Sequence, residues 1–186
     1  KVTKGAALAL LAQVHATKPV PDYAKVVEYT DQLMGQGYSL LPNYDHLFDG
    51  NHTANAESIF EINGNGGSIW WWGVFMFTGD DWKKFNTPSN DLVKAFNDEG
   101  DTVRKTSSVK FQAVGWADSY WPSSNYPFAW KQRDTTGNQN IYILRYADLL
   151  LLRAEAKVRL GDYTGAAALV NQVRNRAGLG NINISG

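Results

Sequence analysis

Aromatic and small polar side chains are interleaved in the middle of this sequence, in a pattern suited to holding a ligand. The stretch WADSYWPSSNYPF (residues 116–128) mixes large rings with Asp, Ser and Asn, and SIWWWGVFMF (residues 68–77) carries three consecutive tryptophans. An aromatic ring offers a large, rigid contact area and loses little rotamer entropy when it stacks. The polar groups beside it can hydrogen-bond the rim of the same ligand. This mixture predicts a binding surface.

The three consecutive tryptophans cannot all face one core. In a strand, Trp70 and Trp72 would point one way and Trp71 the other, so we predict that Trp71 contacts ligand. Trp121 is the second candidate, because Pro122 restrains the backbone next to it. The predicted ligand-binding residues are Trp71, Trp121, Trp116, Tyr120 and Asn125. The alternative for each tryptophan is a buried anchor, since most aromatic side chains are buried.

Composition excludes several classes of function. The chain has 186 residues, 18 basic and 18 acidic, so it lacks the excess positive charge typical of nucleic-acid binding. There is no cysteine, which excludes disulfides, thiol catalysis and thiolate metal sites within this sequence. No apolar run reaches the 18 or so residues that a membrane-spanning helix needs. We expect the sequence to be a piece of a longer protein.

Histidines provide the remaining possible metal ligands. His46 and His52 are six residues apart, with Asp45 and Asp49 nearby. This is a loose, metal-like cluster without the close spacing of an established motif. We therefore predict no metal site and no cofactor.

The two ends of the chain repeat one helical pattern. DYAKVVEYTDQL (residues 22–33) resembles DYTGAAALVNQV (residues 162–173), and the aspartate that opens each copy is a candidate N-cap. Each copy follows an Ala- and Leu-rich segment, at residues 5–16 and 146–160. This arrangement predicts two tetratricopeptide-like helix pairs, with ordinary antiparallel helix pairs as the alternative. We expect Arg153 and the other arginines of these helices on helix surfaces.

These elements predict a mainly α fold in which the helix pairs pack against a loop-rich insertion with short strands. The expected organisation of the single domain fragment 1–186 is a first helix pair at 5–35, an irregular aromatic-rich insertion at 36–140 and a second pair at 141–180. Within the insertion, ESIFEIN (residues 57–63) alternates apolar and polar residues and predicts a short strand. NTPSNDLVKAF predicts a helix capped by Thr87, with Pro88 in its first turn.

Six segments, in this order, resemble the SusD/RagB-type outer-membrane nutrient-binding lipoproteins. They are TKGAALALLAQV, GYSLLPNYDHLF, ESIFEI, SNDLVKAF, ILRYADLLLLRAEAKVRLGDY and LVNQVRNRAGL. The resemblance runs from Thr3 to about Leu179, and RYADLLLLRAEA followed by NQVRNRAGL is its most specific part.

The resemblance implies a helical, non-catalytic protein on the outward face of the bacterial outer membrane. Such proteins bind oligosaccharides, polysaccharides or other nutrients and help to deliver them to a SusC-like TonB-dependent transporter. They are tethered by an N-terminal lipidated cysteine, which the present sequence lacks, so membrane association would come only from an anchor outside it. Family ligand residues differ between members, so none is transferred to this sequence.

Two alternatives to glycan binding stay open. A helical-repeat scaffold could use the same rings to bind a protein or peptide partner. A glycoside hydrolase would need two carboxyl groups, about 5–5.5 or 6.5–9.5 Å apart. The aspartates near the rings are Asp80, Asp81, Asp118 and Asp134. No glutamate lies in the aromatic stretches 70–82 and 116–130, and we predict that the protein is not an enzyme.

Overall fold

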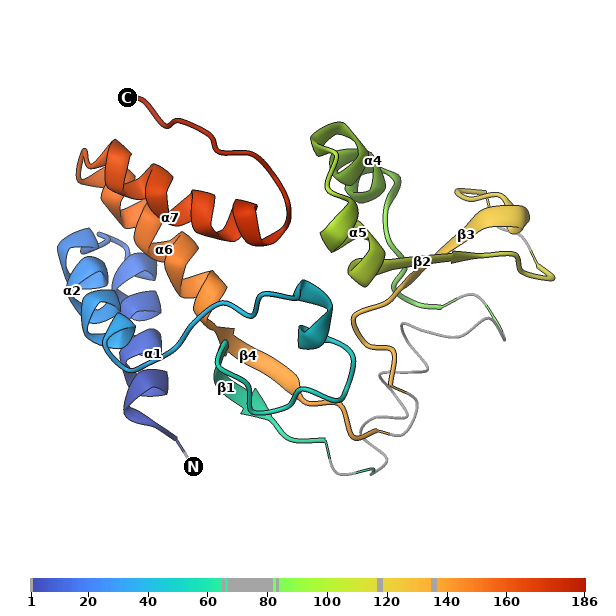
Figure 1. Cartoon of the computed structure of the whole chain (residues 1–186), viewed down its shortest axis with the longest axis horizontal. Coiled ribbons are helices and arrows are strands. Elements are labelled where there is room, and N and C mark those ends of the chain that lie inside the picture. Colours follow the sequence, from blue (N-terminus) through green and yellow to red (C-terminus); the bar gives the residue numbers. More distant parts are fainter. Residues whose placement is uncertain (1, 65, 67–81, 83, 117–118, 135–136) are drawn as a thin grey trace. The chain divides into compact units, whose positions relative to one another are not determined.

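The chain folds into two compact units with mainly helical structure, which confirms the predicted fold class. The computed structural model describes residues 2–64, 66, 82, 84–116, 119–134 and 137–186 (Figure 1). The first unit comprises residues 1–42, 54–62 and 141–186, and the second comprises residues 43–53 and 63–140. None of the helices among the described residues combines the length and apolar character that crossing a membrane requires.

Four helices form the body of the first unit (Figure 1). They are α1 (Lys4–Thr17), α2 (Tyr23–Met34), α6 (Tyr146–Arg159) and α7 (Tyr163–Arg176). Helix α2 packs against both α1 and α6, and α7 packs against α6. The small side chains of Ala6, Ala9 and Ala12 on α1 are fully buried, which lets the neighbouring helices approach closely. These contacts form the two helix pairs that the sequence predicts.

Aspartate caps begin the second helix of each pair, as predicted. The Asp22 carboxylate accepts a hydrogen bond from the Lys25 N–H at 3.1 Å, and Asp162 does the same for the Gly165 N–H at 2.8 Å. Each bond satisfies a backbone donor that has no partner within its own helix. Gly161 follows the end of α6 with φ at +85°, a conformation that favours glycine.

A short antiparallel strand pair completes the first unit. Strand β1 (Ser58–Ile62) pairs with β4 (Ile141–Arg145), and β4 continues directly into α6. Strand β1 lies in the segment ESIFEIN, so this prediction is confirmed. The register shifts twice between Ser58 and Glu61, as in a β-bulge.

Arg153 is not a surface residue, contrary to the sequence-based expectation. Its side chain extends from α6 to α2, where it donates to the Val27 carbonyl at 3.0 Å and the Thr30 hydroxyl at 3.1 Å. Its guanidinium also pairs with Asp31 at 2.5 Å. The three acceptors on α2 explain how a charged side chain that is only 8% exposed is accommodated between the helices.

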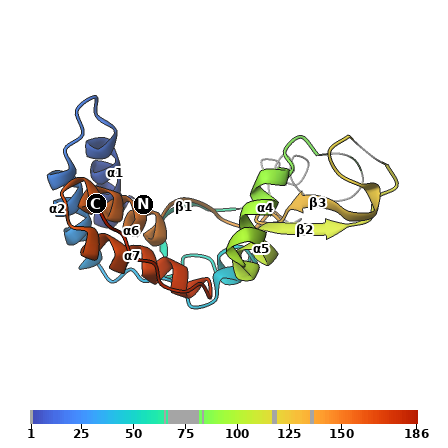
Figure 2. The same ribbon diagram turned by 90° about the horizontal axis from the view of Figure 1, so that it is seen from above.

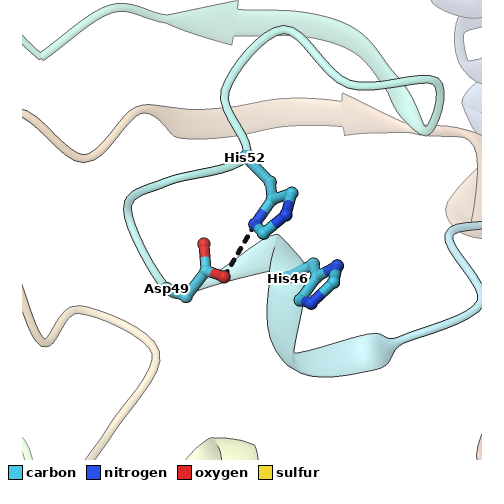
Figure 3. A group of neighbouring side chains, drawn as sticks. All are labelled: His46, Asp49 and His52. Carbon is cyan, nitrogen blue, oxygen red and sulfur yellow. Dashed lines mark hydrogen bonds and ion pairs between the residues drawn. The ribbon is translucent and has the colours of Figure 1, made fainter.

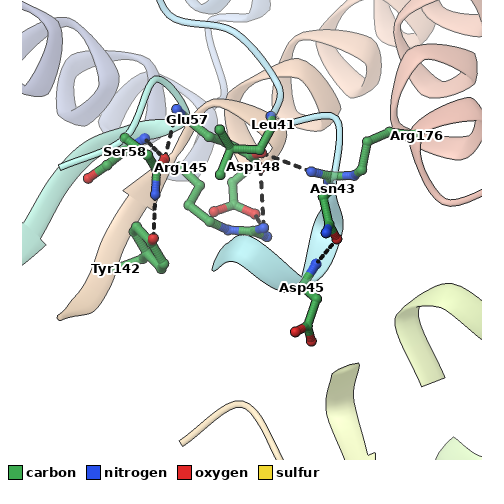
Figure 4. Close-up of polar contacts among 10 residues, drawn as sticks. Leu41, Asn43, Asp45, Glu57, Ser58, Tyr142, Arg145, Asp148 and Arg176 are labelled. Atoms are coloured by element: carbon green, nitrogen blue, oxygen red, sulfur yellow. Dashed lines mark hydrogen bonds and ion pairs between the residues drawn. The ribbon is translucent and has the colours of Figure 1, made fainter. Parts of the chain in front are cut away.

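Glu57 lies at the centre of a buried ionic cluster in the first unit (Figure 4). The cluster connects the β1–β4 strand pair, helix α7 and the loop that follows α2. The Glu57 carboxylate is fully buried and pairs with Arg145 at 3.3 Å and Arg176 at 2.8 Å. The same carboxylate accepts a hydrogen bond from the Leu41 N–H at 3.0 Å. Asn55 supports the turn before β1, because its side-chain oxygen accepts from the Glu57 N–H at 3.0 Å. Arg176 is thus a second arginine that the sequence places wrongly on a helix surface.

Short helices and one antiparallel strand pair make up the regular structure described in the second unit (Figure 2). Its elements are η1 (Tyr44–Leu47), α4 (Asn90–Glu99), α5 (Thr102–Ser108), β2 (Val109–Gln112), η2 (Ser123–Asn125) and β3 (Tyr126–Ala129). Strands β2 and β3 pair antiparallel. Tyr126 and Phe128 of β3 are 0% and 1% exposed, and their ring centroids are 5.3 Å apart. Large rings therefore hold this loop-rich unit together.

Helix α4 begins two residues later than predicted. Ser89, not Thr87, is its N-cap, and the Ser89 hydroxyl accepts a hydrogen bond from the Leu92 N–H at 3.1 Å. Pro88 therefore precedes the cap instead of occupying the first turn. Both Thr and Ser can cap a helix, so residue preference alone does not distinguish the two positions.

Candidate ligand-binding site

A hollow of about 460 Å³ opens in the second unit beside the N-terminal end of α4. Two segments line it, one leading into α4 and the other preceding η2. The lining residues are Lys84, Phe85, Thr87, Pro88, Ser89, Asn90, Asp91, Tyr120 and Trp121. Two of the predicted ligand-binding residues, Tyr120 and Trp121, thus lie in one cavity wall. The volume falls within the range of small-molecule sites.

Two aromatic side chains of the hollow are unusually exposed. Tyr120 is 71% exposed and Phe85 is 69% exposed. Across the described part of the chain, no other Phe, Tyr or Trp side chain is as exposed, and both line this cavity. Exposed rings gathered in one concave surface are typical of ligand-binding sites, so the hollow is a candidate site.

Trp121 fixes one wall of the hollow. Its ring packs edge-on against Phe111 of β2, with the centroids 6.0 Å apart, and is only partly exposed. The Lys105 ammonium lies 5.7 Å from the centroid of the Phe111 ring. Because Trp121 precedes Pro122, its backbone is restrained to extended conformations. Trp121 combines a structural contact with access to the cavity.

Polar side chains around the rings supply charges and hydrogen-bonding groups. Lys84 is only 4% exposed, and its ammonium lies 5.4 Å from the Trp82 ring centroid. Asn90 and Asp91 belong to the first turn of α4 and are exposed. The exposed Asn90 amide and Asp91 carboxylate can donate to and accept from a ligand with many hydroxyl groups.

The other predicted site residues lie elsewhere. Trp116 is partly buried, with its ring 4.7 Å from Tyr126 and 6.3 Å from Phe128, both in edge-on contact, as an anchoring ring would be. Asn125 ends η2, is exposed and is not part of the cavity lining. Trp71 lies outside the described residues. The aspartates at 80, 81 and 118 do so as well.

Sequence reasoning missed Phe85, which shares the hollow with Tyr120. A signal was present, because Phe85 is a single ring between Lys84 and Asn86, in a polar segment. Its nearest aromatic neighbour along the chain, Trp82, packs edge-on against it at 5.1 Å, and no apolar periodicity places Phe85 on a helix or strand face. Such a residue is a candidate for exposure.

A second, more open hollow of about 540 Å³ lies near Arg133 in the same unit. Arg133 donates from Nη1 and Nη2 to the two carboxylate oxygens of Asp45, at 2.9 and 2.6 Å. The Arg133 guanidinium also lies 5.7 Å from the centroid of Trp130, and Lys110 lies 4.5 Å from the same ring. Because two cations already contact Trp130, we assign this ring a structural role.

The hydrogen bonds from Arg133 hold the pKa of the Asp45 carboxyl below its usual value of 3.8. A carboxyl group whose pKa is lower in the folded state than in the unfolded state stabilises the folded state. This stabilisation is fully present above the unfolded-state pKa and is lost as the pH falls through the folded-state pKa. Arg133→Met should therefore destabilise the protein by about 1 kcal/mol near neutral pH, a modest amount because Asp45 is partly exposed. The difference should shrink towards about pH 3, as measured by urea unfolding at both pH values. An equal difference at the two pH values would contradict this assignment.

Comparison with protein families decides the identity of the fold. The model of the SusD family matches residues 22–186 of the sequence. The chain belongs to the SusD family. The predicted resemblance is thereby confirmed over most of the chain. None of the curated proteins gives a significant match.

Solved structures share the same SusD fold at low sequence identity. A SusD superfamily protein from Bacteroides vulgatus has 23% identity and a TM-score of 0.73, covering 96% of this chain and 44% of its own. Surface glycan-binding protein A from Bacteroides uniformis has 22% identity and a TM-score of 0.69, covering 97% and 42%. A laminarin-binding SusD-like protein has 22% identity and a TM-score of 0.69, covering 97% and 49%. This SusD-family chain therefore spans less than half the length of each of these structures.

Proposed function

We propose that this SusD-family chain binds oligosaccharide or polysaccharide nutrients at the hollow beside α4, without cleaving them. The observation that carries the proposal is the placement of Phe85 and Tyr120, the two most exposed Phe, Tyr or Trp side chains of the described residues, in one cavity. A pyranose ring presents flat C–H faces that stack on such rings and a rim of hydroxyls that hydrogen-bond polar neighbours. Asn90 and Asp91 are placed for the second role.

The comparisons support a glycan as the ligand class. Two of the similar structures are named for glycan or laminarin binding. They share the fold at 22% identity, so they support the class of ligand and not a particular sugar. Following the family, we further propose that the whole protein acts on the outward face of the outer membrane. There it would deliver its glycan to a SusC-like TonB-dependent transporter.

The described lining of the hollow does not offer the paired carboxyl groups of a hydrolase. Glycoside hydrolases place two carboxyl groups across the scissile bond. Of the described residues that line the cavity, Asp91 alone carries a carboxylate. A binding role needs no such pair, since stacking and hydrogen bonds are sufficient.

Affinity gel electrophoresis through a panel of polysaccharides tests the proposed function. We expect one polysaccharide to retard the wild-type protein and the Leu160→Ala variant, which alters an exposed apolar residue in the first unit. The Phe85→Ala/Tyr120→Ala variant should migrate as it does in a gel without polysaccharide. Equal retardation of the double variant would move the site elsewhere.

The same polysaccharide tests the absence of catalysis. After prolonged incubation with the purified protein, we expect no increase in reducing ends. Release of oligosaccharides that depends on Asp91 would show a hydrolase instead. Association with a TonB-dependent transporter, measured by co-purification, should persist in the double variant, because the proposal assigns Phe85 and Tyr120 to the glycan alone.

A further inference from the structure

Two histidines and an aspartate of the second unit meet in a cluster separate from the proposed glycan site (Figure 3). His46 lies on η1, and Asp49 and His52 lie in the turn that follows. One ligand atom from each of the three falls within 4.8 Å of the others. The two imidazole rings are stacked, with centroids 3.7 Å apart and planes 6° apart. His52 Nδ1 and an Asp49 carboxylate oxygen are 2.7 Å apart.

The surrounding segment holds these side chains in place. Gly50, with φ at +78°, reverses the chain so that His52 returns to Asp49. Asp49 also accepts a hydrogen bond from the Asn51 N–H at 2.9 Å, and its side chain is only 18% exposed. Immediately after η1, the Phe48 ring packs edge-on against Tyr44 in the core of the unit, 5.3 Å away. These contacts fix the positions of η1, which carries His46, and of Asp49.

The chemistry of the three side chains favours one group of metal ions. Two imidazoles and a carboxylate form a ligand set that suits zinc and the other late first-row divalent ions. Calcium instead prefers six to eight oxygen ligands. The nitrogen lone pairs of an imidazole lie in the plane of its ring. Because the two ring planes are nearly parallel, the lone pairs of His46 and His52 do not point at a common position. One ring must therefore rotate about its side-chain bonds before both can coordinate the same ion. His52 can do so, because its side chain is 44% exposed.

We propose that His46, Asp49 and His52 bind one Zn²⁺ ion. The ion joins η1 to the returning turn through three protein ligands, with water completing a four-coordinate shell. This site is independent of glycan binding, since none of the three residues lines the hollow beside α4. The spacing of the residues along the sequence does not predict it, because the turn at Gly50 brings them together.

Titration calorimetry with Zn²⁺ tests this proposal on the protein without a histidine tag. We expect binding of one ion per chain, weakened at least tenfold by His46→Ala or His52→Ala and about tenfold by Asp49→Asn. His15→Ala is the matched control, because His15 is the third histidine of the sequence and lies on α1 in the first unit. It should bind Zn²⁺ as the wild type does.

A second measurement needs no variant of the cluster. In NMR spectra of the wild-type protein, one equivalent of Zn²⁺ should shift the imidazole signals of His46 and His52 and leave those of His15 unchanged. The absence of stoichiometric binding would overturn the proposal and leave the stacked histidines as a packing contact. The proposal would also be overturned if His46→Ala bound Zn²⁺ as the wild type does, or if Zn²⁺ shifted only the signals of His15.

Discussion

Replacing Glu57 with alanine should lower the free energy of unfolding by about 3–5 kcal/mol, the largest effect that we expect from a single substitution away from the binding site. The carboxylate is fully buried and pairs with Arg145 and Arg176. Removing it takes the shared buried carboxylate away from two guanidinium groups, of which Arg145 keeps its more exposed partner Asp148, at 3.0 Å. Buried charges that lose their partner are strongly destabilising.

The loss should involve several segments of the first unit at once. The Glu57 carboxylate also accepts a hydrogen bond from the backbone N–H of Leu41 at 3.0 Å, and alanine removes this acceptor. The carboxylate thus connects the loop after α2, strand β4 and helix α7, which are far apart in the sequence. A conservative Glu57→Gln change keeps an acceptor for Leu41 but not the charge, so we expect an intermediate loss.

Urea unfolding followed by circular dichroism measures this prediction. Glu155→Ala is the matched control, because Glu155 lies on the exposed side of α6, and its replacement should change stability by less than about 0.5 kcal/mol. A Glu57→Ala variant that unfolds at the same urea concentration as the control would show that the ionic cluster contributes no net stability.

The second large effect concerns affinity. Tyr120→Ala and Phe85→Ala should each weaken glycan binding about tenfold, because each removes a ring that a sugar face covers. The double variant should bind about a hundredfold more weakly if the two rings contact separate parts of the ligand. Both side chains are more than two-thirds exposed, so neither substitution should reduce stability greatly.

Titration calorimetry with an oligosaccharide from the retarding polysaccharide measures these losses. Tyr120→Phe keeps the ring and should retain most of the affinity. Trp121→Ala should lose both affinity and some stability, because Trp121 also packs on Phe111. If Tyr120→Phe binds as weakly as Tyr120→Ala, the hydroxyl and not the ring face would carry the interaction.

Local patterns in the sequence predicted the helical part of the fold. The repeated Asp-Tyr pattern located α2 and α7, and Asp22 and Asp162 cap those helices as expected. These features depend on side chains within a few residues of one another, so spacing along the chain is sufficient to find them.

Contacts between distant residues could not be predicted in the same way. Glu57 and Arg176 are 119 positions apart, and nothing in their local sequence distinguishes them from surface residues. Trp116 and Tyr120 are both aromatic residues in one polar stretch, yet Trp116 packs on the β3 rings and Tyr120 is exposed. Which ring faces solvent depends on how the chain turns, and this follows only from the folded structure.

A crystal structure of the protein with an oligosaccharide from the retarding polysaccharide would test the proposed glycan site most directly. We predict a sugar ring stacked on Tyr120 or Phe85 at van der Waals distance, about 3.5–4.0 Å, with hydroxyls bonded to Asn90 or Asp91. A sugar bound elsewhere, with both rings left in solvent, would contradict the assignment of the site.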